Sequence, residues 1–120
     1  MKEKSNFLRE NISFPLSLVG MPLTIKNQTI DNVLKTVGLT AQADVMVDKL
    51  SGGEQQLVSI ARAIVHRPEF IIADEPTGNL DPVTSEDIMK LFNEINHMGT
   101  TIIMVTHNKE LVNSMHKRVV

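Results

Sequence analysis

Two short apolar runs, residues 70–73 and 101–105, flank a stretch whose apolar residues recur at helical spacing. A strand, a helix and a second strand in this order form a βαβ unit, in which the two strands run parallel in one sheet. Because helices cover both faces of such sheets, we expect both strands to be buried. Ligands bind beyond the carboxyl ends of such strands, so the polar residues that follow each run are the first functional candidates.

Helices are predicted before, between and after the two strands. The helix between them starts at Asp81-Pro82, an N-cap followed by a first-turn proline, and ends at Gly99. Three helices are expected to bury one apolar face each. The first helix ends at Gly38 and the second before Pro68. Their buried faces, in chain order, are Ile30, Val33, Leu34 and Val37; Leu57, Ile60, Ala61 and Ile64; and Ile88, Leu91, Phe92 and Ile95. A last short helix would carry Leu111, Val112 and Met115, with a further strand from residue 118.

The order of the predicted elements indicates one α/β domain, and the composition, which is that of an ordinary globular protein, excludes several functions. The 120 residues carry 12 Lys and Arg against 14 Asp and Glu, which argues against a strongly basic nucleic-acid binder. The absence of cysteine excludes disulfides and thiolate metal sites. No run approaches the roughly 18 apolar residues of a membrane helix, so we expect a soluble, intracellular chain. The chain stops at Val120 without a polar tail, and we expect an incomplete architecture.

Ser51-Gly52-Gly53-Glu54 stands at the head of a predicted helix and allows two interpretations. Ser51 and Glu54 have the spacing of a capping box, in which each side chain binds the other residue's backbone N–H. Two glycines are unnecessary for a cap and weaken the first turn. They would instead let an anionic group approach bare backbone N–H groups at the positive end of the helix dipole.

Three further segments hold polar residues near strand ends. Asp74 is suited to hold Mg²⁺ through oxygen, and the adjacent Glu75 to polarise a water in phosphoryl transfer, although an exposed acidic loop would look the same. Asp81 is explained by its N-cap position alone. His107 follows the second apolar run and could contact a phosphate there, although a lone histidine is more often a surface residue. We interpret the remaining histidines as solvated: His66, His97 and His116.

Together and in this order, these segments resemble the nucleotide-binding subunits of ATP-binding-cassette (ABC) transporters. Residues 50–56 match the family's signature motif, and residues 70–75 match its Walker B strand with a catalytic glutamate. Residues 79–81 match its D-loop, and His107 its switch histidine. The resemblance covers about residues 8–120.

One subgroup of the family is particularly similar. Residues 73–81, residues 10–20 and residues 104–109 look like the cell-division ATPases of the FtsE type, and the lipoprotein-release and macrolide-export ATPases are close alternatives. The resemblance implies part of a P-loop NTPase fold, with a helical subdomain over residues 1–49. The signature helix and part of the parallel-sheet catalytic core would follow over residues 50–120.

The resemblance also implies a role for each site residue. In the family, two subunits sandwich two ATP molecules, so this chain would act in a homodimer or with a partner ABC ATPase. Ser51 and Gly53 would touch the γ-phosphate of ATP bound to the partner, and Gly52 and Glu54 would belong to the same ATP-binding segment. Asp74 would help position Mg²⁺, Glu75 would activate water, His107 would sense the γ-phosphate, and Asp81 would couple the two sites.

Some family features are missing from these 120 residues. No Gly-x-x-x-x-Gly-Lys-Ser/Thr phosphate loop exists, the Q-loop is absent, and Leu57 stands where the family usually has Arg. We therefore expect the second half of an FtsE-like ATPase that is inactive alone. A binding-only pseudo-subunit and a non-functional truncated product are the other hypotheses.

A membrane partner is implied as well. By resemblance, residues 1–25 would face an integral-membrane, permease-like subunit of the FtsX type, with contacts from Phe7, Phe14, Leu16, Leu18 and Met21. The chain would then lie in the cytoplasm, held at the inner face of the cell membrane by that subunit.

Overall fold

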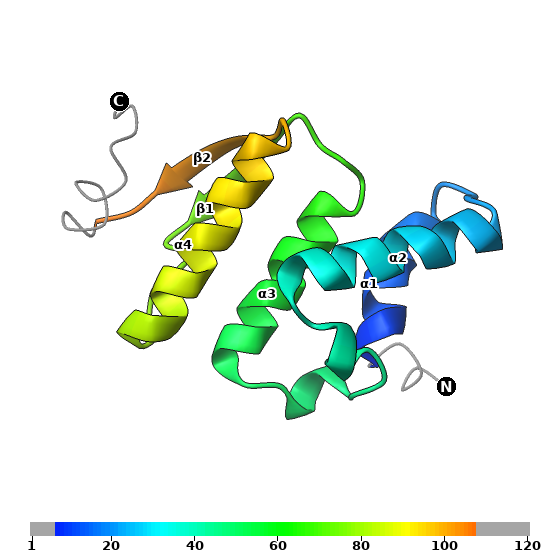
Figure 1. Cartoon of the computed structure of the whole chain (residues 1–120), viewed down its shortest axis with the longest axis horizontal. Coiled ribbons are helices and arrows are strands. Elements are labelled where there is room, and N and C mark those ends of the chain that lie inside the picture. Colours follow the sequence, from blue (N-terminus) through cyan, green and yellow to red (C-terminus); the bar gives the residue numbers. More distant parts are fainter. Residues whose placement is uncertain (1–6, 108–120) are drawn as a thin grey trace.

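The computed structural model describes residues 7–107. In chain order the elements are α1 (Leu8–Ser17), α2 (Leu23–Val37), the short 3-10 helices η2 (Thr40–Gln42) and η3 (Val47–Lys49), α3 (Gly52–Ile64), β1 (Phe70–Asp74), α4 (Pro82–His97) and β2 (Thr101–Val105). Figure 1 shows α1, α2 and α3 gathered at one end of the molecule and α4 beside the two strands at the other. The helix and strand predicted within residues 111–120 lie outside the described part of the chain.

The two strands form the predicted parallel pair. Their register runs from Phe70 opposite Thr101 to Asp74 opposite Val105. The backbone N–H of Glu75 donates to the carbonyl oxygen of Val105 at 2.7 Å, which continues the pairing one residue beyond β1. The carboxyl ends of β1 and β2 therefore lie at the same edge of the sheet, as a βαβ unit requires.

The expectation that both strands are buried was wrong, because each is covered on one face only. The covered face packs against the core with Ile71, Ala73, Ile102 and Met104. The other face leaves about half or more of each apolar side chain exposed: Phe70, Ile72, Ile103 and Val105. Side chains alternate along a strand, so a helix layer on one side of the sheet cannot cover both sets. No helix of residues 7–107 lies over the second face.

Local signals predicted the helix ends correctly. Gly38 ends α2 in the left-handed conformation, with a φ of 77°. Asp81 caps α4, and Pro82 occupies its first turn. The predicted apolar face of α4 is buried, and Ile60 and Ala61 are buried on α3. Leu57 and Ile64, the other two residues of the predicted apolar face of α3, are partly buried against the same core.

The N-terminal helix contributes to this core more than the sequence analysis expected. Leu8, Ile12 and Leu16 are at most 1% exposed, so Leu16 is a core residue and the expectation that it contacts a partner was wrong. With a spacing of four residues, these three side chains lie on the same face of α1, which packs against α2 and α3. No helix within residues 7–107 is long and apolar enough to cross a membrane.

Candidate functional site

The head of α3 contains the predicted capping box. The hydroxyl oxygen of Ser51 accepts a hydrogen bond from the backbone N–H of Glu54 at 3.1 Å. The Glu54 carboxylate in turn accepts from the backbone N–H of Ser51 at 3.0 Å. The Ser51 O–H proton is not used in this exchange, so the hydroxyl can still donate to an oxygen of a ligand.

The two glycines of this segment differ in their surroundings. A Cβ atom on Gly53 would lie 2.6 Å from Cγ2 of Thr84, in the first turn of α4, which is too close for any carbon contact. A Cβ atom on Gly52 would meet only the end of Leu80, at 4.0 Å. Packing between α3 and α4 therefore favours glycine at position 53, a reason that sequence analysis did not find. The position of Gly52 leaves its backbone exposed.

Glu75 is the most firmly held of the predicted site residues. Its backbone adopts a left-handed conformation, with a φ of 47°, which is uncommon for a residue other than glycine. Its carboxylate accepts from the backbone N–H of His107 at 2.7 Å and from the hydroxyl of Thr106 at 3.3 Å. Such non-glycine conformations persist only where surrounding contacts hold them, and they cluster at functional sites.

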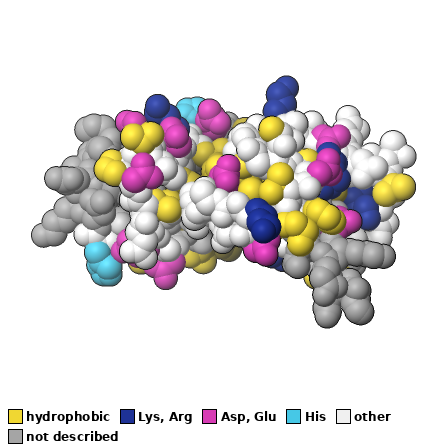
Figure 2. Space-filling model, turned by 90° about the horizontal axis from the view of Figure 1, so that it is seen from below, with side chains coloured by type: hydrophobic (Ala, Val, Ile, Leu, Met, Phe, Trp, Pro, Cys, Tyr) yellow, Lys and Arg dark blue, Asp and Glu magenta, His cyan; other side chains and the backbone are white. Residues whose placement is uncertain are grey.

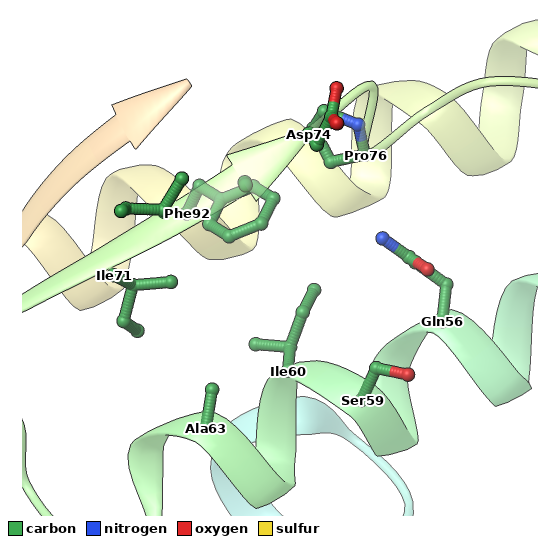
Figure 3. Close-up of a pocket in the computed structure, with 10 residues that line it drawn as sticks. Gln56, Ser59, Ile60, Ala63, Ile71, Asp74, Pro76 and Phe92 are labelled. Atoms are coloured by element: carbon green, nitrogen blue, oxygen red, sulfur yellow. The ribbon is translucent and has the colours of Figure 1, made fainter. Parts of the chain in front are cut away.

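Asp74 ends β1, and its side chain is exposed. Figure 3 shows Asp74 and Pro76 together at this end of the strand, with the Asp74 carboxylate pointing away from α3. A carboxylate oxygen is the ligand type that Mg²⁺ prefers, so Asp74 fits the predicted role. Among the described residues no group of three or more His, Cys, Asp or Glu side chains forms a metal cluster.

A cavity of about 170 Å³ lies between α3, β1 and α4. Its lining is mostly apolar, with Asp74 at one end and the polar side chains of Gln56 and Ser59 on α3. In Figure 3 the Gln56 side chain points from α3 toward the end of β1. The cavity thus connects the helix that begins at Ser51 with the strand end that carries Asp74.

Asp81 acts as the N-cap of α4. Its carboxylate accepts a hydrogen bond from the backbone N–H of Thr84 at 3.4 Å. Hydrogen bonds from Thr84, the side-chain bond first, lower the pKa of Asp81 below its ordinary value, although desolvation acts in the opposite direction. Thr84 also lies beside Gly53, so one residue links Asp81 to the segment at the head of α3.

The predicted residues thus form two groups. Glu75 and His107 meet at the carboxyl ends of β1 and β2, beside Asp74, and the contact is made by the backbone N–H of His107. The residues at the head of α3 lie beside the Asp81 end of α4, where Gly53 adjoins Thr84. Sequence analysis missed Thr84 and Thr106. The one sequence feature that could have pointed to Thr106 is its position directly before His107, a predicted site residue.

Comparison with known proteins identifies the family. The family model described as ABC transporter matches residues 1–78. The cell division ATP-binding protein FtsE of Bacillus subtilis is 55% identical over 112 residues, which is 92% of this chain and 49% of that protein. The FtsE protein of Mycobacterium tuberculosis is 52% identical over 111 residues, 92% of this chain and 48% of that protein.

A solved structure agrees with the sequence relatives. The structure of cbiO1 from Clostridium perfringens, described as part of the ABC transporter complex cbiONQ, matches with a TM-score of 0.80 at 34% identity. The match covers 84% of this chain and 41% of that one. This chain belongs to the ABC transporter family, and its fold is part of the P-loop NTPase fold of an ABC ATPase domain. It spans about half the length of the curated relatives that it matches.

Proposed function

We propose that this chain supplies the signature, Walker B, D-loop and switch-histidine segments of an ATP-binding and ATP-hydrolysing subunit of the FtsE-like ABC type. The observation that carries the proposal is the anchoring of Glu75 at the carboxyl ends of two parallel strands, beside Asp74. Ligands bind at this edge of parallel sheets. The two FtsE relatives favour a role in cell division over the export-type alternatives.

Glu75 is suited to act as a general base. Each of its carboxylate oxygens accepts one hydrogen bond from β2's end, which leaves each oxygen a second acceptor position for a water molecule. A water held there can pass a proton to the carboxylate while its oxygen attacks the γ-phosphorus of ATP. The bond from that phosphorus to the oxygen bridging it to the β-phosphate breaks as the new bond forms, so ADP leaves with the bridging oxygen. Asp74 would hold Mg²⁺, which neutralises charge on the phosphates when it is bound.

The signature segment would act on ATP held by a second subunit. The N-terminus of α3 presents backbone N–H groups and a positive dipole end, and the exposed Ser51 hydroxyl keeps its proton for donation. Glu54 supports this arrangement by holding the Ser51 backbone. Gly52 and Gly53 lack side chains that would block an approaching phosphate. The partner would be a second copy of the same subunit or another ABC ATPase.

His107 and Asp81 would communicate the state of the nucleotide. His107 binds Glu75 through its backbone N–H and leaves its side chain exposed, so this side chain can contact a γ-phosphate near the same strand ends. Asp81 caps α4 one turn from Thr84, which packs on Gly53. A displacement of the signature segment would therefore reach Asp81 through Thr84, and this contact supports its role in coupling the two sites.

We assign residues 1–49 to a helical subdomain and residues 50–120 to part of the catalytic core. The membrane partner, of the FtsX type, would bind near residues 1–25 and hold the subunit at the cytoplasmic face of the membrane. Apolar side chains on α1, the following turn and the start of α2 are more than half exposed: Phe14, Leu18, Val19, Leu23 and Ile25. Figure 2 shows hydrophobic side chains reaching the surface among charged groups on the face that it presents.

The ATPase proposal is tested in a fusion that joins the part of Bacillus subtilis FtsE preceding the matched region to this chain. The fusion should bind ATP and release phosphate in the presence of Mg²⁺. Glu75→Gln should reduce turnover at least about 10²-fold and leave ATP affinity unchanged, because the side chain acts on water. A fusion that binds ATP without hydrolysing it would support the binding-only alternative, and full activity of Glu75→Gln would refute the assigned base.

The membrane partner is tested separately by cross-linking. Photoreactive probes at Phe14 and Met21 of the fusion should capture the FtsX-type membrane subunit when both are expressed together. A probe at the exposed Met98, between α4 and β2, serves as the control. Capture from Met98 alone, or only of the fusion itself from Phe14 and Met21, would contradict the assigned face.

A further inference from the structure

Three consecutive residues at the end of β2 bind Glu75. The carbonyl oxygen of Val105 accepts from the Glu75 backbone N–H at 2.7 Å. The hydroxyl of Thr106 donates to Oε2 of Glu75 at 3.3 Å, and the backbone N–H of His107 donates to Oε1 at 2.7 Å. Both the main chain and the carboxylate of Glu75 are therefore held by one short segment of the neighbouring strand.

Two of these three bonds come from the backbone and are available whatever the side chains are. The third comes from the Thr106 hydroxyl, the only one of the three that a substitution can remove without altering the chain path. A glutamate carboxylate held through one oxygen can still rotate about the last side-chain bond, because the torsion angle of that bond takes a broad range of values. A second donor on the other oxygen fixes the plane of the carboxylate and so the direction of its remaining acceptor positions.

We propose that Thr106 is a positioning residue for Glu75, and this inference rests on the proposed function of Glu75 as general base. The hydroxyl of Thr106, part-buried at the end of β2, holds the carboxylate plane so that its free acceptor positions face the attacking water. Small errors in the direction of a reacting group lower the rate of a chemical step without weakening substrate binding. Thr106 therefore affects turnover through Glu75.

The test compares four variants in the ATPase fusion. Thr106→Val keeps the shape of the side chain and removes the donor, so kcat should fall about tenfold with KM for ATP unchanged. Thr106→Ala should behave in the same way and serves if the valine variant fails to fold. Thr106→Ser keeps the hydroxyl and should retain most of the activity. Thr101→Val makes the same chemical change at the exposed start of β2 and should leave kcat unchanged.

A double-mutant cycle separates positioning from a general structural effect. In the Glu75→Gln background, Thr106→Val should change the residual rate by less than about twofold, because the carboxylate that it positions is gone. Three results would overturn the inference. The first is a full tenfold loss of rate from Thr106→Val in the Glu75→Gln background, and the second is a normal kcat for Thr106→Val alone. The third is a loss of kcat in Thr106→Ser as large as that in Thr106→Val. If Glu75→Gln itself hydrolyses ATP at the normal rate, the proposed function fails. An inactive Glu75→Gln with a fully active Thr106→Val removes only the role of Thr106.

Discussion

Gly53→Ala tests whether packing inside the chain itself favours glycine at position 53. Alanine is preferred over glycine in a helix by about 1 kcal/mol, so propensity alone predicts a gain in the free energy of unfolding. The structure predicts the opposite. The new methyl group would lie 2.6 Å from Cγ2 of Thr84, whereas ordinary contact begins at 3.4 Å. Forcing an extra carbon into a filled space costs about 1–3 kcal/mol.

The expected net effect is a loss of about 1 kcal/mol, the difference between the packing cost and the helix gain. Gly52→Ala is the matched control, because its methyl group would meet nothing closer than 4.0 Å. That variant should be unchanged or more stable by up to about 1 kcal/mol. Both values are measured by urea unfolding of the 120-residue chain, followed by far-UV circular dichroism.

Thr84→Ser identifies the atom responsible. Serine lacks Cγ2 but keeps the hydroxyl that bonds to Asp81, so the Gly53→Ala change should no longer destabilise the chain in this background. The two changes should therefore be coupled by about 1–2 kcal/mol. Equal stability of Gly53→Ala and Gly52→Ala, or a loss that persists in the Thr84→Ser background, would refute the reasoning.

Three other outcomes are expected. Ser51→Ala removes the α3 cap and should lower the free energy of unfolding by about 1 kcal/mol, with Ser59→Ala on the exposed side of the same helix as the control. The pKa of Asp81 is lowered in the folded state, so its carboxylate stabilises the fold above about pH 4 and loses this effect as the pH falls through the folded-state pKa. The difference in free energy of unfolding between the chain and Asp81→Asn should therefore shrink on acidification. A difference that stays constant with pH would contradict this. The 120 residues alone contain no phosphate loop and should release no phosphate from Mg²⁺-ATP above background, with Glu75→Gln indistinguishable from the parent.

The sequence by itself determined the features that depend on neighbours within about four residues. Asp81-Pro82 at the start of α4, Gly38 at the end of α2 and the pairing of Ser51 with Glu54 were all predicted, because helix caps are local hydrogen-bond arrangements. The parallel strand pair followed from the order of elements, since a crossover helix leaves the two strands parallel. The candidate residues followed from the same order, because they stand where strands and helices meet.

Only the tertiary structure decided which distant residues meet. Thr106 and Glu75 are 31 positions apart, and their hydrogen bond depends on the path of the chain through α4. The contact of Gly53 with Thr84 and the burial of Leu16 likewise depend on how helices pack, which no local pattern specifies. The open face of the sheet was missed for the same reason. An apolar run shows that the side chains on both faces of a strand can be buried. Which face is actually covered depends on the helices that pack against the sheet.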